Sequence, residues 1–139
     1  MFGTVPIVDA LTDEIFIVSF DYSEGNPIFF TKLYAENPDI KNDNELYGTT
    51  LSNAAEASAA APIYFDPKIM GTHILIDGGV IANNPSLYAY EYANKVLDKK
   101  LIRIVSIGTA IGPGKKLDAD TVNLLDWALE ISSLITTPE

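Results

Sequence analysis

The segment from Ala57 to Pro85, ASAAAPIYFDPKIMGTHILIDGGVIANNP, holds the residues of this chain that are best suited to chemistry. Asp77 ends a short apolar run that predicts a strand over residues 72–77, and Gly78 and Gly79 follow directly. In open α/β sheets the reactive groups lie beyond the carboxyl ends of the strands. Because glycine has no side chain, a second group can approach such a carboxylate closely. Taken alone, however, Asp-Gly-Gly is more often a tight turn than an active site.

The same loop contains the start of a helix. Asn83, Asn84 and Pro85 follow the glycines, and Asn84 is predicted to be the N-cap with Pro85 at the first helical position. Proline is tolerated at that position because its missing N–H would have no partner there in any case. The helix is predicted to run to about Leu97.

Further elements must position this loop. We expect a hairpin formed by residues 14–21 and 27–34, followed by an exposed loop at residues 36–48. Two more helices are expected at residues 51–60 and 121–135, and one more strand at residues 101–107. Pro62 ends the first of these helices and Asp120 is expected to cap the last. Residues 14–21 and 101–107 are apolar on both sides, which indicates strands covered on both faces. Helices that alternate with such strands predict an α/β fold, a three-layer α/β/α sandwich.

Composition narrows the function. The 139 residues suffice for a single domain, residues 1–139, and 47% of them are hydrophobic. Nineteen acidic against nine basic residues give a net charge of −10, which argues against nucleic acid as a partner. The basic residues Lys99, Lys100, Arg103, Lys115 and Lys116 cluster within 18 residues; they form either a solvated rim or a contact to an anionic membrane surface.

The sequence argues against a nucleotide-binding loop, a zinc site, a signal peptide and a transmembrane helix. The loop from Gly108 to Lys115 has Thr109 where a phosphate-binding loop needs glycine, and Lys116 where it needs serine or threonine. One histidine and no cysteine argue against a zinc site, and no cofactor is expected. No segment reads as a signal peptide or a transmembrane helix, which favours an intracellular location without deciding it.

His73, the only histidine, is read as a strand-end residue. A strand rises about 3.3 Å per residue, so the backbone of His73 should lie roughly 13 Å from that of Asp77. A hydrogen bond between these two side chains is therefore not expected.

Three blocks in this order resemble patatin-like phospholipases. The first is Ala57 to Phe65, the second is Ile76 to Pro85 with its Asp-Gly-Gly and Asn-Asn-Pro, and the third is Ile104 to Thr109. Ala59 departs from the family, which usually has serine there. The resemblance covers roughly residues 10 to 115 and implies a mixed, mostly parallel sheet within the sandwich.

The resemblance also implies a serine–aspartate dyad that cleaves lipid esters. Asp77 would be the base that deprotonates a serine, with Gly78, Gly79, Asn83, Asn84 and Pro85 as its supporting motif. A serine hydroxyl is a weak nucleophile and needs an adjacent base. The family carries this serine in Gly-x-Ser-x-Gly on a strand-to-helix turn.

None of the eight serines of this chain lies in Gly-x-Ser-x-Gly. We therefore expect the chain to be the carboxyl-terminal portion of a patatin-like lipid acyl hydrolase, with the serine on an upstream segment or a partner chain. By itself the chain is expected to be inactive. Two alternatives stay open: a non-catalytic relic that acts as an interaction or structural subunit, and an unrelated α/β binding domain that shares only the turn.

Overall fold

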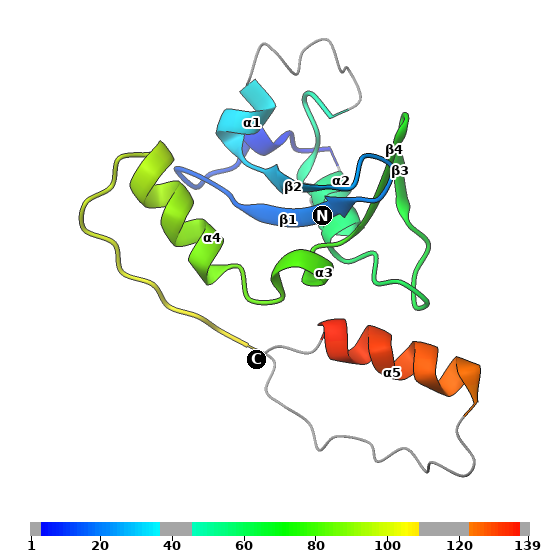
Figure 1. Cartoon of the computed structure of the whole chain (residues 1–139). Helices are drawn as coiled ribbons and strands as arrows, with labels where there is room; N and C mark the ends of the chain where they lie inside the picture. The colour runs from blue at the N-terminus through cyan, green and yellow to red at the C-terminus, as the bar shows by residue number, and fades with distance from the viewer. Residues whose placement is uncertain (1–3, 37–45, 109–122, 137–139) are drawn as a thin grey trace. The chain divides into compact units, whose positions relative to one another are not determined.

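The computed structural model describes residues 4–36, 46–108 and 123–136, and the chain divides into two compact units, Met1–Ile81 and Ala82–Glu139 (Figure 1). That residues 1–139 form a single domain, part of a larger fold, stays a prediction. Among the described residues no helix combines the length and the apolar character needed to cross a membrane.

A four-stranded sheet with the order β2-β1-β4-β3 forms the centre of the first unit. Its strands are β1 (Ile17–Asp21), β2 (Asn26–Phe30), β3 (Lys68–Met70) and β4 (His73–Asp77). The predicted hairpin is confirmed, since β1 pairs with β2 from Ile17↔Phe30 to Asp21↔Asn26. The predicted strand that ends at Asp77 is confirmed as β4.

All neighbouring strands of this sheet are antiparallel, so the α/β class holds but the mostly parallel sheet is not confirmed. The physical reason lies in the connections. Short turns join β1 to β2 and β3 to β4, and a short turn can join only antiparallel strands, whereas parallel neighbours need a long crossover.

The second hairpin strand is shorter than predicted, and a helix follows it. The prediction extended this strand through residue 34, but α1 (Lys32–Glu36) begins after Thr31. Thr31 Oγ1 accepts a hydrogen bond from the backbone N–H of Tyr34 at 2.9 Å, the arrangement of a helix cap. Glu14 Oε1 accepts from the N–H of Lys32 at 2.6 Å, which satisfies another donor of the first turn. Sequence reasoning missed this cap.

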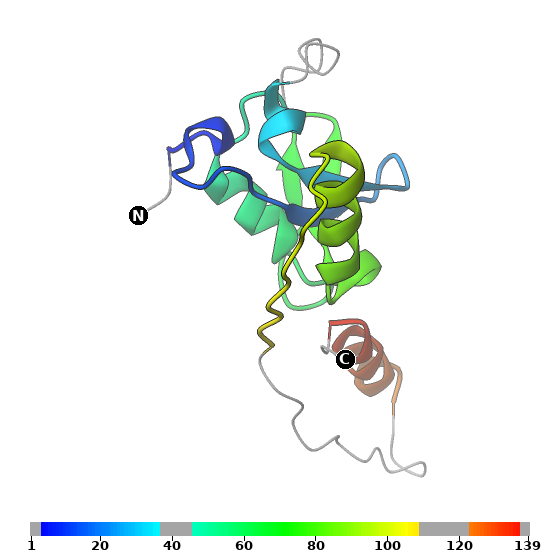
Figure 2. The same cartoon turned by 90° about the vertical axis from the view of Figure 1, so that its left-hand side faces the viewer.

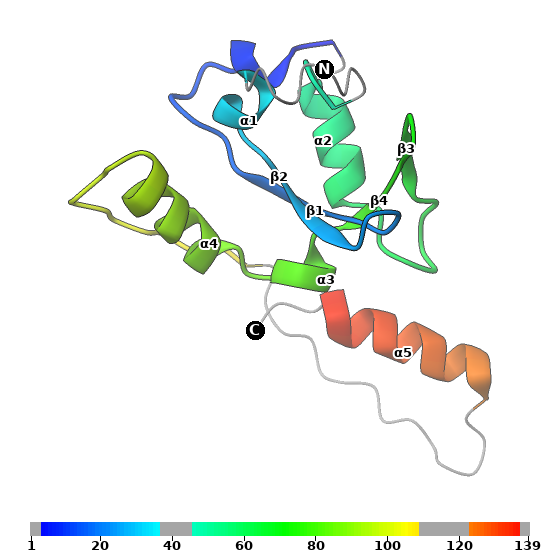
Figure 3. The same cartoon turned by 45° about the horizontal axis from the view of Figure 1, so that its top comes forward.

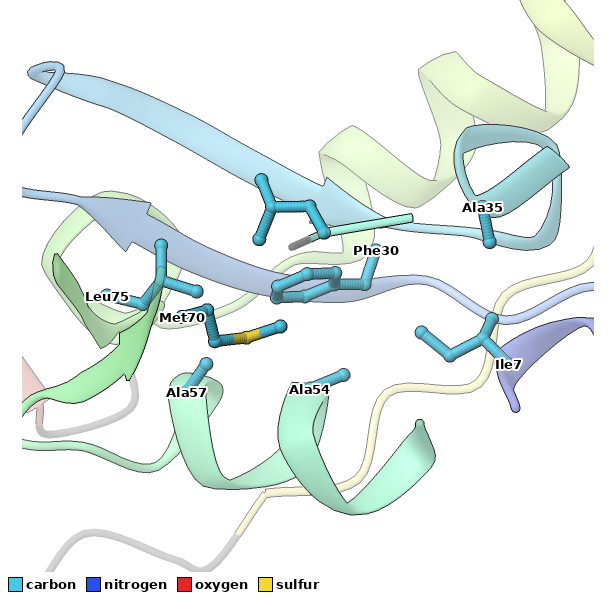
Figure 4. Packing of buried hydrophobic residues seen from close by; sticks show 8 residues of the cluster. Ile7, Phe30, Ala35, Ala54, Ala57, Met70 and Leu75 are labelled. Atoms are coloured by element: carbon cyan, nitrogen blue, oxygen red, sulfur yellow. The ribbon is translucent and has the colours of Figure 1, made fainter. Parts of the chain in front are cut away.

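The predicted helix before Pro62 is confirmed as α2 (Leu51–Ser58), which Thr50 caps by accepting from the N–H of Asn53 at 3.2 Å. This helix packs along one face of the sheet, against β1, β4 and β3 (Figure 3). Ala54 and Ala57 point from α2 toward the sheet, where they meet Phe30, Met70 and Leu75 (Figure 4). Small side chains on the helix therefore allow close packing over the larger ones of the strands.

The same core also includes Ile7, from the short helix η1 (Ile7–Asp9), and Leu46. Leu46 is 2% exposed, so the expectation of an exposed loop over residues 36–48 is wrong at its end. Residues 37–45 of that loop lie outside the described residues.

In the second unit, the predicted helix after Asn84 is present as α4 (Ser86–Glu91), followed by a π-helical turn, η3 (Tyr92–Val96). Pro85 occupies the cap position that was predicted for Asn84. Asn84 still serves the helix start, because its Oδ1 accepts from the N–H of Ser86 at 3.1 Å. The boundary differs from the prediction by one residue, which is the usual uncertainty of helix ends.

Residues 101–107 do not form the predicted strand. The segment runs extended after η3 (Figure 2), and Leu101 and Ile107 are 98% and 91% exposed. A strand needs a neighbour to satisfy its backbone groups, and no strand of the described residues pairs with this segment.

The last helix is α5 (Leu124–Thr136). Asn123 Oδ1 accepts from the N–H groups of Leu125 and Asp126, and Asp126 Oδ2 accepts from the N–H of Asn123 at 3.0 Å. This reciprocal arrangement is a capping box. Asp120, the predicted cap, lies outside the described residues.

Candidate active site

Asp77 is the last residue of β4, and its backbone is fastened to the end of α2. The N–H of Asp77 donates to the carbonyl of Ala60 at 3.0 Å, and the N–H of Gly78 donates to the carbonyl of Ser58 at 3.2 Å. These two bonds join the first two sequence blocks, residues 57–65 and 76–85. The last turn of a helix has carbonyls without helical partners, and here the Asp-Gly-Gly turn supplies partners at that end.

Gly78 allows a close backbone approach, but to a strand and not to the carboxylate. A Cβ atom at this position would lie 2.1 Å from the backbone oxygen of Val18 in β1 and 2.6 Å from its carbonyl carbon. No side chain fits at such a distance. The sequence argument that a side chain must be absent at this position therefore holds. The structure shows that the group approaching Gly78 is the backbone of β1.

The Asp77 carboxylate is held by the turn that follows it. Oδ1 accepts the N–H of Gly79 at 2.6 Å, where the short helix α3 (Gly79–Ala82) begins. Asp77 is partly buried, and the structure records no partner for Oδ2 among the described residues. One oxygen thus sets the direction of the carboxylate, while the other can accept a proton from a donor placed beside it.

Ser19 supports the strand end from β1 and was not singled out in the sequence. It is fully buried, lies opposite Asp77 in the β1–β4 register, and donates from Oγ to the carbonyl of Ile76 at 2.7 Å. The same Oγ lies 3.4 Å from the carbonyl of Ala57 in α2. The signal that could have found it is a hydroxyl inside an otherwise apolar strand, since a buried polar group requires a partner.

A second polar cluster, missed in the sequence, lies at the other end of β4. His73 Nδ1 is 2.6 Å from Oδ2 of Asp21, a carboxylate whose side chain is 1% exposed. Asp21 Oδ1 accepts from the hydroxyl of Ser23 at 2.5 Å and from its N–H at 3.0 Å. Burial raises the pKa of Asp21, but the hydrogen bonds from Ser23, His73 and the N–H of Glu24 outweigh it and hold the pKa below its usual value.

This cluster has a structural role, because the Asp21 carboxylate is buried and both of its oxygens are occupied by Ser23, His73 and the N–H of Glu24. The prediction of a strand-end histidine is confirmed, since His73 opens β4. Its contact with Asp21 was not predicted.

In the second unit the helix-start residues meet the third sequence block. Asn83, Asn84 and Pro85 line a cavity of about 450 Å³ together with Ser86 and the segment from Val105 to Gly108. The two blocks that lie farthest along the chain are thus brought together. Among the described residues no three histidine, aspartate or glutamate side chains are grouped as metal ligands.

Comparisons with known proteins agree with the first two blocks. The family described as patatin-like phospholipase matches residues 7–90, a range that includes Asp77 and Pro85. A protein of Escherichia coli (strain TW11681) named cGAMP-activated phospholipase is 38% identical over 136 residues, which is 91% of this chain and 36% of that protein. Patatin-2-Kuras 4 of Solanum tuberosum is 34% identical over 130 residues, 77% of this chain and 33% of the potato protein.

A protein of Escherichia coli named cUMP-AMP-activated phospholipase is 38% identical over 77 residues, half of this chain and 24% of its own length. The chain therefore spans about a third or less of the length of these curated relatives. Since the family match covers more than half of the chain, this protein belongs to the patatin-like phospholipase family.

Proposed function

We propose that this chain supplies the base-bearing part of a lipid acyl hydrolase, with Asp77 as the general base of a serine–aspartate dyad. The observation that carries the proposal is the fixed carboxylate at a strand end. Its backbone is bonded to Ala60, and its Oδ1 is oriented by the N–H of Gly79. The family membership supports the ester-hydrolase chemistry.

In this mechanism the nucleophile is the serine of a Gly-x-Ser-x-Gly segment outside the chain. Asp77 accepts the hydroxyl proton as the serine oxygen attacks the ester carbonyl. The carbon–oxygen bond to the alcohol then breaks, the alcohol leaves with the proton that Asp77 took from the serine, and an acyl-serine remains. Water attacks this second ester, again with Asp77 as proton acceptor; the bond to the serine oxygen then breaks, Asp77 returns the proton to that oxygen, and the fatty acid is released. In this scheme the carboxylate itself is the base, and His73 is in contact with Asp21 at the other end of β4.

The substrate of this reaction is a lipid or another acyl ester, presented at a membrane surface or in monomeric form. The partner is the polypeptide that carries the serine, either upstream in the same protein or in a separate chain. Neither a cofactor nor a nucleic acid enters the scheme.

One observation favours a second candidate, a non-catalytic subunit. All eight serines of the chain lie outside Gly-x-Ser-x-Gly, so the chain by itself has no family nucleophile. A patatin-like relic that only binds a partner would show the same fold and the same Asp77 turn.

The two candidates separate in a reconstituted enzyme, in which the chain is fused to or mixed with the polypeptide that carries Gly-x-Ser-x-Gly. Asp77→Asn keeps the shape but cannot accept the serine proton. It should lower kcat/KM for a phospholipid or a p-nitrophenyl ester by about 10²–10⁴-fold, or about 3–5 kcal/mol in the barrier. Asp13→Asn is the matched control, because Asp13 is exposed. The proposal fails if the Asp77→Asn enzyme keeps full turnover, or if the isolated chain hydrolyses the ester.

A further inference from the structure

A groove of about 390 Å³ lies beside the end of α2. Its walls are Ala59 and Ala60, which directly follow the helix, Phe65 and Pro67 from the loop beyond them, and Glu56 and Lys68 at the rim. The volume falls within the range of small-molecule sites, roughly 300–1,000 Å³.

The groove opens on the same face of the sheet as Asp77. Lys68 lies opposite Leu75 in the β3–β4 register, so their side chains share a face of the sheet. Leu75 and Asp77 are two residues apart in β4 and therefore also share a face. Leu75 packs into the core beneath α2, which identifies this face as the one that α2 covers. Ala60 belongs to both sites, because it lines the groove and its carbonyl accepts the N–H of Asp77.

The chemistry of the walls favours an aliphatic ligand. At the rim the charge of Glu56 is neutralised by Lys68, with Nζ 2.5 Å from Oε2, and Oε1 accepts from Ser52 at 3.1 Å. Asp66, the third charged residue of the lining, is exposed. Methyl groups, a proline ring and a phenyl ring make up the rest, and such surfaces gain free energy only by covering apolar groups.

A strained turn presents the phenyl ring at the groove. Ile63 has φ +75°, a conformation that β-branched residues rarely adopt, and Tyr64 and Phe65 both donate their N–H groups to the carbonyl of Ala61. Phe65, two residues after Ile63, is 66% exposed. Backbone strain next to an exposed aromatic ring is consistent with a ligand contact for that ring.

We propose that this groove, the acyl groove, binds the hydrocarbon chain of the ester substrate. The inference rests on the proposed function, since it takes its ligand class from the lipid ester that Asp77 would help to cleave. A chain that lies along Ala59, Ala60 and Phe65 has its ester end next to the residue whose carbonyl holds Asp77. The acyl groove would therefore select esters by the length of their acyl chain.

Binding can be tested with the full chain labelled with ¹⁵N and titrated with alkylphosphocholines of increasing chain length, below the concentrations at which they form micelles. Affinity should rise about fourfold for each methylene that the groove buries and level off once the groove is full. The largest shift changes should occur at the amides of Ala59, Ala60 and Phe65. Affinity that does not depend on chain length would overturn the proposal.

A matched pair of substitutions locates the ligand. Ala59→Phe fills the acyl groove from an exposed position and should weaken binding of the longest probe at least tenfold. Ala55→Phe introduces the same side chain one turn earlier on α2, also at an exposed position outside the groove, and should leave binding unchanged. Equal effects of the two substitutions would contradict the assignment, and thermal unfolding of both variants reports whether they are folded.

Hydrolysis by the reconstituted enzyme separates this inference from the proposed function. Ala59→Phe should lower kcat/KM for long-chain esters at least tenfold more than for acetyl esters, whereas Asp77→Asn should lower both alike. If Asp77→Asn is inactive but Ala59→Phe shows no dependence on chain length, the acyl groove is wrong and the dyad stands. If the chain binds alkylphosphocholines but Asp77→Asn retains turnover, the dyad is wrong. A groove that the rest of the complete enzyme fills would show no chain-length dependence, which also overturns the inference.

Discussion

His73 Nδ1 lies 2.6 Å from Oδ2 of Asp21 and joins the first residue of β4 to the last residue of β1. The carboxylate is buried and also receives the hydroxyl and the N–H of Ser23 from the hairpin turn. The start of β4, the end of β1 and the hairpin turn thus meet at the carboxylate of Asp21. This end of the sheet contributes to stability, while the other end of β4 carries the candidate base.

Removal of the histidine should therefore affect stability and not chemistry. His73→Ala takes one hydrogen-bond partner from a buried carboxylate and should lower the free energy of unfolding by about 1.5–3 kcal/mol, measured by urea denaturation. The reconstituted enzyme should keep its kcat within about twofold at a temperature where the variant is folded. A loss of kcat as large as that of Asp77→Asn would instead favour a histidine-based hydrolase.

Acid should weaken the same contact. The folded-state pKa of Asp21 lies below its ordinary value of 3.8, so the unfolded chain takes up a proton first as the pH falls. The contribution of Asp21 to stability should be complete above about pH 5 and should be lost as the pH falls through the folded-state pKa. The difference in unfolding free energy between wild type and Asp21→Asn should therefore narrow below pH 3.8.

Gly78 should not tolerate even alanine. The added Cβ would meet the backbone oxygen of Val18 at 2.1 Å, and a backbone atom in a sheet cannot move aside cheaply. Gly78→Ala should lower the free energy of unfolding by about 1–3 kcal/mol, as overpacked sites do. Gly108→Ala, where an added Cβ meets nothing within 4 Å, should stay within about 0.5 kcal/mol. Equal midpoints of denaturation for the two variants would contradict the close approach of the Asp77 turn to β1.

Ile63→Gly should be neutral or stabilising. A left-handed φ costs an ordinary residue about 1–2 kcal/mol, and glycine adopts it freely at an entropic cost of about 0.5–1 kcal/mol. Ile63 is 53% exposed, so little burial is lost. Ile69→Gly is the control, because Ile69 is 57% exposed in β3 with ordinary strand geometry, and it should be destabilising by about 1 kcal/mol. Denaturant midpoints that fall by the same amount in both variants would show that Ile63 is not strained.

The elements next to the candidate site could be predicted because their signals are local. Pro62 follows the end of α2, the apolar run before Asp77 forms β4, and Asn84 with Pro85 precedes α4. Each signal acts through neighbours a few positions away. The predictions that failed needed partners from elsewhere: residues 101–107 are apolar enough for a strand but have no strand beside them in the described part of the chain.

The sequence by itself determined that Asp77 ends a strand, that two glycines follow it, and that the chain resembles patatin-like phospholipases. Only the tertiary structure decided which atoms hold that turn: the carbonyls of Ser58 and Ala60 meet its N–H groups, and β1 leaves no space for a side chain at Gly78. Only the tertiary structure also decided the partner of His73, because Asp21 lies 52 positions away in the sequence. Strand register sets such contacts between distant residues, whereas periodicity and helix caps report only on near neighbours.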